Sequence, residues 1–175
     1  MKYVLFDLDG TLIKSIETHY YAWKHILKSE SIYIDRENFY INEGENPYFF
    51  LKRVFHENNQ KISDDKIKII IKKKNLKFIK IFKLRLYKNV TSTLKFIKKR
   101  KLGLGLITAA SKKRINTTIP LILLNQFDLI MTKDNIEFNK PHPEIYLKAL
   151  SSLKIKNKEC LAIENSPNGI TAAKK

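Results

Sequence analysis

The start of the chain most constrains the fold, because a short apolar run ends there in a carboxylate. Residues 3–6 favour extended structure, and Asp7 follows them directly. A strand of a parallel sheet is covered on both faces, so it lacks the alternation of apolar and polar residues, as this run does. We therefore predict a buried central strand that carries Asp7 at its carboxyl end.

The turn after this strand predicts a site for a metal ion and a phosphate. Asp9 is the next residue but one after Asp7, so both carboxylates can face one crevice where the strand opens into a loop. Gly10 lets the backbone approach a ligand closely, and Thr11 adds a hydroxyl. Ligands of open α/β sheets bind at the carboxyl ends of the strands, and carboxylates suit hard divalent cations. The alternative is an ordinary cap or turn motif, which the same residue types favour.

Four stretches together resemble the haloacid dehalogenase (HAD) superfamily of aspartate-nucleophile phosphohydrolases. The sequence DLDGT at residues 7–11 matches the first signature of the family, and the other stretches follow in family order over nearly the whole chain. The similarity is greater to the branch that holds β-phosphoglucomutase and small sugar-phosphate phosphatases, because residues 18–23 also look like that branch. The other motif stretches are Leu106–Ser111, Lys140–Pro143 and Glu164–Gly169.

The resemblance implies a role for three catalytic residues. Asp7 matches the nucleophile that attacks phosphorus and forms an aspartyl-phosphate. Asp9 matches the general acid and base, which protonates the leaving oxygen and later activates water. Lys140 matches the lysine that neutralises the charge of the phosphoryl group and of the nucleophile.

The resemblance also implies a set of substrate-binding residues. Thr108 matches the hydroxyl that binds the transferring phosphoryl group, together with the backbone amides of Ala109 and Ala110. Ser111 is an alternative for this role, and either hydroxyl is also a candidate helix N-cap. His19 aligns with a histidine near the cap hinge of the mutase branch, although a histidine on an apolar helix face is often only a packing residue.

The implied metal site is a magnesium site made of Asp7, Asp9, Glu164 and Asn165, with the backbone carbonyl of Asp9 as one ligand. The branch commonly has Glu-Asp where this chain has Glu164-Asn165. An amide oxygen can ligate a hard cation but brings no negative charge, so we expect weaker Mg²⁺ binding than an aspartate would give.

The order of helical and strand patterns predicts an α/β fold, with a Rossmann-like parallel sheet core and an inserted all-helical cap domain. Residues 15–87 show only helical patterns. The resemblance implies that they form the helical cap of this branch, which closes over the site and excludes water. Residues 1–14 and 88–175 are expected to form the core, without the C-terminal edge strand usual in the family. The later strands are expected at 103–108, 128–131 and 160–164. Helices are expected at 15–30, capped by Ser15, then at 35–41, 47–58, 63–86, from Asn89 or Thr91 to 101, at 111–124 with a break at Pro120, at 142–153 and at 166–175.

Composition limits the classes of partner. The formal net charge is +17, but only five of the 34 cations are arginines, and the lysines are scattered over helical polar faces rather than interleaved with exposed aromatics. Readers of nucleic acids usually use arginines for the bases and aromatics for stacking. No apolar run is long enough to span a bilayer, and Met1 leads directly into the buried strand rather than into a signal peptide. We expect a cytoplasmic monomer or weak dimer that binds a small phosphorylated metabolite, no nucleic acid and no membrane.

These observations predict a Mg²⁺-dependent phosphatase that hydrolyses a sugar or polyol phosphate through a phospho-aspartate. A phosphosugar mutase is one alternative, although Pro47 stands where the mutase presents an arginine to the second phosphate of its substrate. Lys52 and Arg53 are candidate replacements for that arginine. A degenerate, non-catalytic binding protein of the same fold is the other alternative, and Asn165 favours it.

Overall fold

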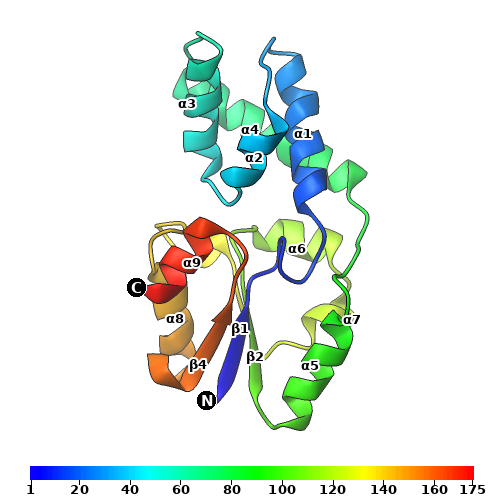
Figure 1. Ribbon diagram of the computed structural model, residues 1–175, viewed down its shortest axis with the longest axis vertical. Coiled ribbons are helices and arrows are strands. Elements are labelled where there is room, and N and C mark those ends of the chain that lie inside the picture. Colours follow the sequence, from blue (N-terminus) through cyan, green and yellow to red (C-terminus); the bar gives the residue numbers. More distant parts are fainter. The chain divides into compact units, whose positions relative to one another are not determined.

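The computed structural model describes residues 1–175 and divides them into two compact units (Figure 1). The sheet unit contains Met1–Lys14 and Leu84–Lys175, and the helical unit contains Ser15–Lys83. The chain thus returns to the sheet unit at Leu84, slightly earlier than the boundary at 87 expected from the sequence.

The sheet unit is built on a four-stranded sheet in which every pairing is parallel, in the order β3-β2-β1-β4. β1 is central, because Leu5 lies opposite Gly105 of β2 on one side and Ala162 of β4 on the other. The prediction of an α/β fold with a Rossmann-like parallel sheet is confirmed. The strands are β1 (Tyr3–Phe6), β2 (Gly103–Ile107), β3 (Leu129–Met131) and β4 (Cys160–Ile163).

Helices cover both faces of this sheet, which explains why β1 and β2 are apolar along their length. α8 and α9 lie on one face and α5, α6 and α7 on the other (Figure 1). On the first face, Leu5 and Ile107 pack in one buried cluster with Tyr146 and Ala149 of α8 and Ala172 of α9. The helices are α5 (Val90–Lys99), α6 (Lys112–Thr118), α7 (Leu121–Leu124), α8 (Glu144–Leu153) and α9 (Pro167–Lys174), with 3₁₀ turns at Lys133–Asn135 and Asn157–Glu159.

The break predicted at Pro120 is confirmed. α6 ends at Thr118, and Ile119 and Pro120 are extended before α7 begins at Leu121. Proline has no backbone N–H and its ring clashes with the preceding turn, so one continuous helix cannot pass through it.

The helical unit has a core of its own. Its buried cluster includes Trp23, Phe50, Phe55 and Ile70, which come from three of its helices. None of the helices in the protein combines the length and the apolar character needed to cross a lipid bilayer. The helices of this unit are α1 (Ile16–Lys28), α2 (Arg36–Ile41), α3 (Pro47–Glu57) and α4 (Asp64–Ile81).

Two details at the ends of these helices differ from the prediction. Ser15 precedes α1, but its side chain makes no cap hydrogen bond. α4 ends at Ile81 rather than at Leu86, because Phe82 adopts an extended conformation (φ −69°, ψ 131°). The residues after it belong to the return of the chain to the sheet unit, where Leu86 forms a bridge with Ile13.

The segments by which the chain leaves and re-enters the sheet unit are hydrogen-bonded to each other. The amide of Lys14 donates to the carbonyl of Arg85 at 2.8 Å, and the amide of Tyr87 donates to the carbonyl of Leu12 at 3.0 Å. We call residues 12–14 and 85–87 the paired connectors. They join the start and the end of the insertion at one place on the sheet unit.

Candidate active site

Asp7 and Lys140 form a buried ion pair at the carboxyl end of β1. The amide of Asp7 donates to Ile163 of β4 at 3.0 Å, which continues the pairing of the strands and fixes the residue at the edge of the sheet. Lys140 Nζ donates to Asp7 Oδ1 at 2.8 Å and to the carbonyl oxygen of Ile107, at the end of β2, at 3.1 Å. Both residues are buried, with exposed fractions of 7% each. The fold thus brings together two groups that are 133 residues apart.

Glu164 joins this pair from the end of β4. Its Oε1 atom accepts hydrogen bonds from Lys140 Nζ and, at 2.7 Å, from the hydroxyl of Tyr146 on α8. The Glu164 side chain is only 3% exposed. One ammonium therefore serves two buried carboxyl groups, which together would carry more negative charge than it balances when both are ionised.

Burial and charge shift the pKa values of these groups. Burial raises the pKa of Asp7 to about 8, against the opposing effect of the Lys140 ammonium. Burial disfavours the charged form of Lys140, but the carboxylates of Asp7 and Glu164 outweigh it and raise the pKa of the ammonium. Burial and the neighbouring Glu164 carboxylate also raise the pKa of Tyr146, so its hydroxyl stays a donor.

The loop that carries Lys140 is held by Glu144, the first residue of α8. The Glu144 carboxylate accepts from the amides of Glu137 at 3.1 Å and Phe138 at 2.7 Å. It also forms an ion pair of 2.7 Å with Lys148, one turn further along the helix. The Lys148 ammonium and these amides lower the pKa of Glu144 to about 2. The segment before Lys140 is thereby tied to the start of α8.

Gly169 makes room for the Glu164 carboxylate in the first turn of α9. A Cβ atom at Gly169 would lie 2.1 Å from Glu164 Oε2 and 2.4 Å from Oε1, which no packed structure tolerates. The helix itself is begun by Ser166, whose hydroxyl accepts from the Gly169 amide at 3.0 Å. The amino end of a helix carries partial positive charge, which favours a carboxylate there. The glycine at 169 is thus explained by the position of Glu164.

We expect Gly169→Ala to destabilise the protein. Glycine to alanine within a helix normally stabilises by about 0.5–1 kcal/mol. Here the added methyl must displace a buried carboxylate from Lys140, and overpacking of this kind costs about 1–3 kcal/mol. Thermal denaturation measures the difference, with Thr171→Ala on the exposed face of the same helix as the control. A higher melting temperature for Gly169→Ala would show that Glu164 does not occupy this position.

Asp9 is held by an arginine that the sequence analysis did not single out. The guanidinium of Arg114, on α6, binds the Asp9 carboxylate at both oxygens, with Nη1 donating to Oδ1 at 3.0 Å and Nη2 donating to Oδ2. The side chains of Arg114 and Asp9 are 10% and 17% exposed. Both oxygens of the predicted general acid and base are therefore engaged by a fixed cation.

The predicted phosphate-binding loop follows β2. Thr108 is buried and its hydroxyl accepts from the amide of Ala110 at 3.1 Å, whereas Ala109 is exposed. The hydroxyl of Ser111 accepts from the Arg114 amide at 3.2 Å and so caps α6. The N-cap alternative thus describes the contact of Ser111, and the same cap fixes the start of the helix that presents Arg114.

Asn165 lies beside the first turn. Its Oδ1 atom accepts from the hydroxyl of Thr11 at 3.1 Å, and the residue is exposed. The predicted metal ligands are all oxygen donors, as a hard divalent cation requires. They are not gathered into a ready-made cluster, since no group of three or more His, Cys, Asp or Glu side chains is placed as a metal site. Within the predicted set, one oxygen of Glu164, Oε2, is buried without a hydrogen-bond partner, which makes it a fitting donor for a cation.

His19, the remaining predicted site residue, belongs to the helical unit. Its Nδ1 lies 2.7 Å from Nζ of Lys74, and its ring stacks on Phe78 with centroids 4.1 Å apart. The Lys74 ammonium also lies over the Trp23 ring, 5.1 Å from its centroid. Lys74 is buried, so His19 takes part in a buried polar contact as well as in aromatic packing.

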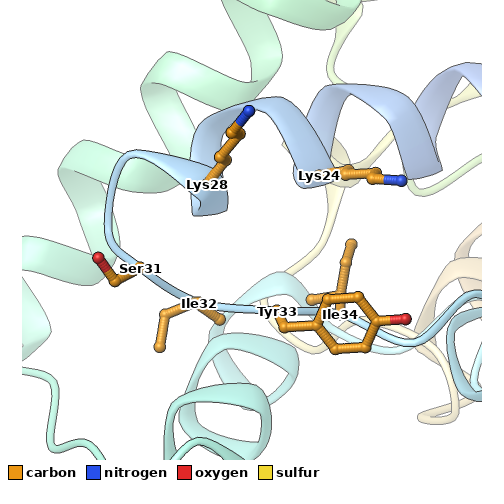
Figure 2. Close-up of a pocket in the computed structure, with 6 residues that line it drawn as sticks. All are labelled: Lys24, Lys28, Ser31, Ile32, Tyr33 and Ile34. Atoms are coloured by element: carbon orange, nitrogen blue, oxygen red, sulfur yellow. The ribbon is translucent and has the colours of Figure 1, made fainter.

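The helical unit also contains a hollow that involves none of the predicted site residues. It has a volume of about 360 Å³ and lies between the C-terminal part of α1 and the segment that follows it (Figure 2). Figure 2 shows two lysines on the helix side and mainly apolar side chains on the other side. Its lining residues are Lys24, Lys28, Ser31, Ile32, Tyr33 and Ile34.

Comparisons with known proteins identify the family to which this chain is similar. The family model for haloacid dehalogenase-like hydrolases matches residues 4–175. The chain is 31% identical to pyrophosphatase PpaX of Bacillus cereus (strain Q1) over 171 residues, which cover 95% of this chain and 76% of the relative. It is 28% identical to beta-phosphoglucomutase of Bacillus subtilis (strain 168), covering 99% of this chain and 79% of the relative.

The fold of a solved structure is also similar to that of this chain. The crystal structure of beta-phosphoglucomutase from Clostridium difficile superposes with a TM-score of 0.86 at 28% identity, over 99% of this chain and 80% of that one. The matched span includes all four motif stretches and the contacts that they make in the sheet unit. The chain therefore belongs to the haloacid dehalogenase-like hydrolases.

Proposed function

We propose that this protein is a Mg²⁺-dependent phosphatase that hydrolyses a small phosphorylated metabolite, a sugar or polyol phosphate, through a phospho-Asp7 intermediate. The observation that carries the proposal is the buried contact between Asp7 and Lys140 at the end of the central strand. A carboxylate fixed beside a cation is oriented for attack and shielded from repulsion by an anionic substrate. The relatives named as a pyrophosphatase and a phosphoglucomutase also act on phosphorylated compounds, as their names state.

Each of the proposed catalytic and binding residues has a different role in the reaction. Asp7 Oδ attacks phosphorus while the bond between phosphorus and the leaving oxygen breaks, and the Asp9 carboxyl gives its proton to that oxygen. Water, deprotonated by Asp9, then hydrolyses the aspartyl-phosphate and releases phosphate. Lys140 balances the charge of Asp7 and of the phosphoryl group, and Thr108 with the amides after it binds the phosphoryl oxygens. The helical unit is proposed as the cap that selects the substrate and excludes water.

A divalent metal is typical of phosphatases in this family, and we propose Mg²⁺ here. Asp7, the Asp9 carbonyl, Glu164 and Asn165 would hold it, because all of them offer oxygen ligands. When bound, it would supply positive charge to orient and neutralise the phosphoryl group. The excess of carboxylates over the single ammonium of Lys140 favours such a cation.

A phosphosugar mutase is supported less well. The candidate replacements for the missing cap arginine are engaged within the helical unit. Arg53 forms ion pairs with Glu45 at 2.7 Å and with Glu57 at 3.0 Å. Lys52 forms one with Asp64 at 3.0 Å. Neither cation is placed to hold a second phosphate without giving up a carboxylate partner, so hydrolysis is the better proposal.

Phosphate release from a panel of sugar and polyol phosphates, with and without Mg²⁺, tests the proposal. Release that requires Mg²⁺ supports a phosphatase. Conversion of β-glucose 1-phosphate to glucose 6-phosphate without release would favour the mutase. No turnover of any compound, together with retained binding of phosphate, would favour the non-catalytic alternative.

We expect Asn165→Asp to bind Mg²⁺ about tenfold more tightly than the natural chain. The substitution adds one negative charge to the ligand set at unchanged size, and carboxylate charge is what raises the affinity of oxygen sites for hard cations. Asn165 is exposed, so the change costs little desolvation. Titration calorimetry of both proteins measures the affinities, and Asn168→Asp in the next turn is the matched control. Equal affinity of Asn165→Asp and the natural chain would remove Asn165 from the metal site.

A further inference from the structure

The ammonium of Lys140 has no hydrogen-bond donor to spare in this structure. A lysine side chain has three N–H donors. The Nζ atom donates to Asp7 Oδ1 at 2.8 Å, to the Ile107 carbonyl at 3.1 Å and to Glu164 Oε1. To bind a phosphoryl oxygen, as the proposed reaction requires, Lys140 must therefore release one of these three acceptors.

Glu164 is the acceptor whose release costs least. Asp7 must stay oriented toward phosphorus, and Ile107 lies at the fully buried end of β2, where an acceptor left without a donor is unfavourable. Glu164 Oε1 differs from both, because it also accepts from the hydroxyl of Tyr146 at 2.7 Å. That second hydrogen bond can remain when Lys140 turns to the phosphoryl group.

The carboxylate of Glu164 depends on these two donors alone. Its other oxygen, Oε2, is buried without a hydrogen-bond partner, and the side chain is only 3% exposed. Without the Tyr146 hydroxyl, release of Lys140 would leave both oxygens of a buried carboxylate unpaired, which is strongly unfavourable. Lys140 would then stay on Glu164, and the phosphoryl group would be bound less tightly.

The helix α8 fixes Tyr146 independently of Lys140. The Tyr146 amide donates to the Pro143 carbonyl at 2.9 Å, at the start of α8, and the side chain packs in the buried cluster beside the sheet. The Lys140 ammonium also lies over the Tyr146 ring, 5.5 Å from its centroid. The hydroxyl can therefore keep its hold on Glu164 while the ammonium moves.

We infer that Tyr146 is a positioning residue, whose hydroxyl holds Glu164 while Lys140 exchanges this carboxylate for the phosphoryl group of the substrate. The inference rests on the proposed function and adds a step to it. In this step the hydrogen bond between Lys140 and Glu164 breaks, the one between Lys140 and a phosphoryl oxygen forms, and no proton changes its owner. Tyr146 itself does not touch the substrate.

Binding of inorganic phosphate to the folded protein tests this inference. Titration calorimetry is done without Mg²⁺, so that Glu164 has no cation besides Lys140. Tyr146→Phe keeps the ring and removes only the hydroxyl, and we expect it to bind phosphate about tenfold more weakly than the natural chain does. Tyr3→Phe, which removes a hydroxyl beside the same buried cluster, is the control and should leave the affinity unchanged.

A hydroxyl with a merely structural role would change the melting temperature but not the phosphate affinity of the folded protein. Unchanged affinity in Tyr146→Phe would therefore overturn the inference, and so would a natural chain that binds no phosphate. If the natural chain binds phosphate but releases none from any ester, the proposed function fails, whereas the affinities still decide the role of Tyr146.

Glu164→Gln shows whether the effect of Tyr146 passes through Glu164. Glutamine has nearly the same shape but no charge, so losing Lys140 costs it less. In this background Tyr146→Phe should weaken phosphate binding less than about twofold, against about tenfold in the natural chain. An equal loss in the two backgrounds would contradict the proposed exchange.

A crystal structure of the natural chain with phosphate gives an independent measurement, which also decides the matter if Tyr146→Phe does not fold. We expect the Tyr146 hydroxyl to remain on Glu164 Oε1, and Lys140 Nζ to lie more than about 3.5 Å from that oxygen. Lys140 still bound to Glu164 beside the phosphate, or a Tyr146 hydroxyl that has left Glu164, would refute the inference.

Discussion

Asp7→Asn is expected to abolish phosphate release, with kcat at least about 10³-fold below that of the natural chain. An amide of the same shape fills the space of the carboxylate and can still accept a hydrogen bond from Lys140. It cannot, however, form the acyl-phosphate bond on which the proposed reaction depends. Because the shape is retained, the loss should appear in kcat while the protein stays folded.

The measurement is phosphate release at saturating substrate, with circular dichroism to verify folding. Asp65→Asn is the control, since Asp65 is an exposed acid of the helical unit that pairs only with a surface lysine at 3.1 Å. The control should retain full activity. Turnover by Asp7→Asn at more than about a hundredth of the natural rate would exclude Asp7 as the nucleophile.

Lys140→Met is expected to reduce both activity and stability. Removing the ammonium leaves the carboxylates of Asp7 and Glu164 buried without the cation that they share. Loss of one partner of a buried ion pair costs about 3–5 kcal/mol, because the remaining charge stays buried. The phosphoryl group loses a neutralising charge in the same step, so we expect kcat to fall about 10²- to 10³-fold.

Urea denaturation and phosphate release measure the two effects. Lys158→Met, at an exposed lysine, should leave both quantities unchanged. The double variant Lys140→Met/Glu164→Gln should be more stable than Lys140→Met, because it lacks one of the two buried carboxylates that have lost their cation. It should be no more active than Lys140→Met. A Lys140→Met protein as stable as the natural chain would contradict the buried pair.

The sequence predicts which side chains meet at the edge of the sheet, because the fold itself brings strand ends together. Asp7 and Glu164 each follow a strand, and parallel strands end at the same edge of a sheet. Lys140 could be placed with them only through the motif that contains it, since it lies in a loop 133 residues away from Asp7. Residues at the ends of buried strands can therefore be located from the sequence pattern, whereas a loop residue such as Lys140 can be assigned to the site only through a known motif.

Arg114 and Gly169 show what sequence patterns do not reveal. Arg114 is one cation among 34 lysines and arginines, and its role depends on the side of α6 that faces the sheet unit. Arginine is seldom buried and needs a partner when it is, but the sequence does not show which arginine is buried. Gly169 lies in a quoted motif, but its function follows from the position of the Glu164 carboxylate, which only coordinates show.

Helix ends are harder to predict from the sequence than helix positions, for a physical reason. The apolar pattern of α4 continues past Ile81, yet the chain becomes extended there, because Leu86 pairs with Ile13 instead of continuing the helix. A contact with a distant segment thus overrides the local helical preference. A contact of this kind cannot be predicted from the residues next to the helix end in the sequence.

The paired connectors have a consequence for how such a protein can diversify. The insertion starts and ends at adjacent, hydrogen-bonded segments, so both of its ends join the sheet unit at one place. All four strands, and the carboxylates at their ends, lie outside residues 15–83, so we expect changes within the insertion to leave the strand order intact. The helical unit can therefore change in the course of evolution while the predicted catalytic residues of the sheet unit stay the same.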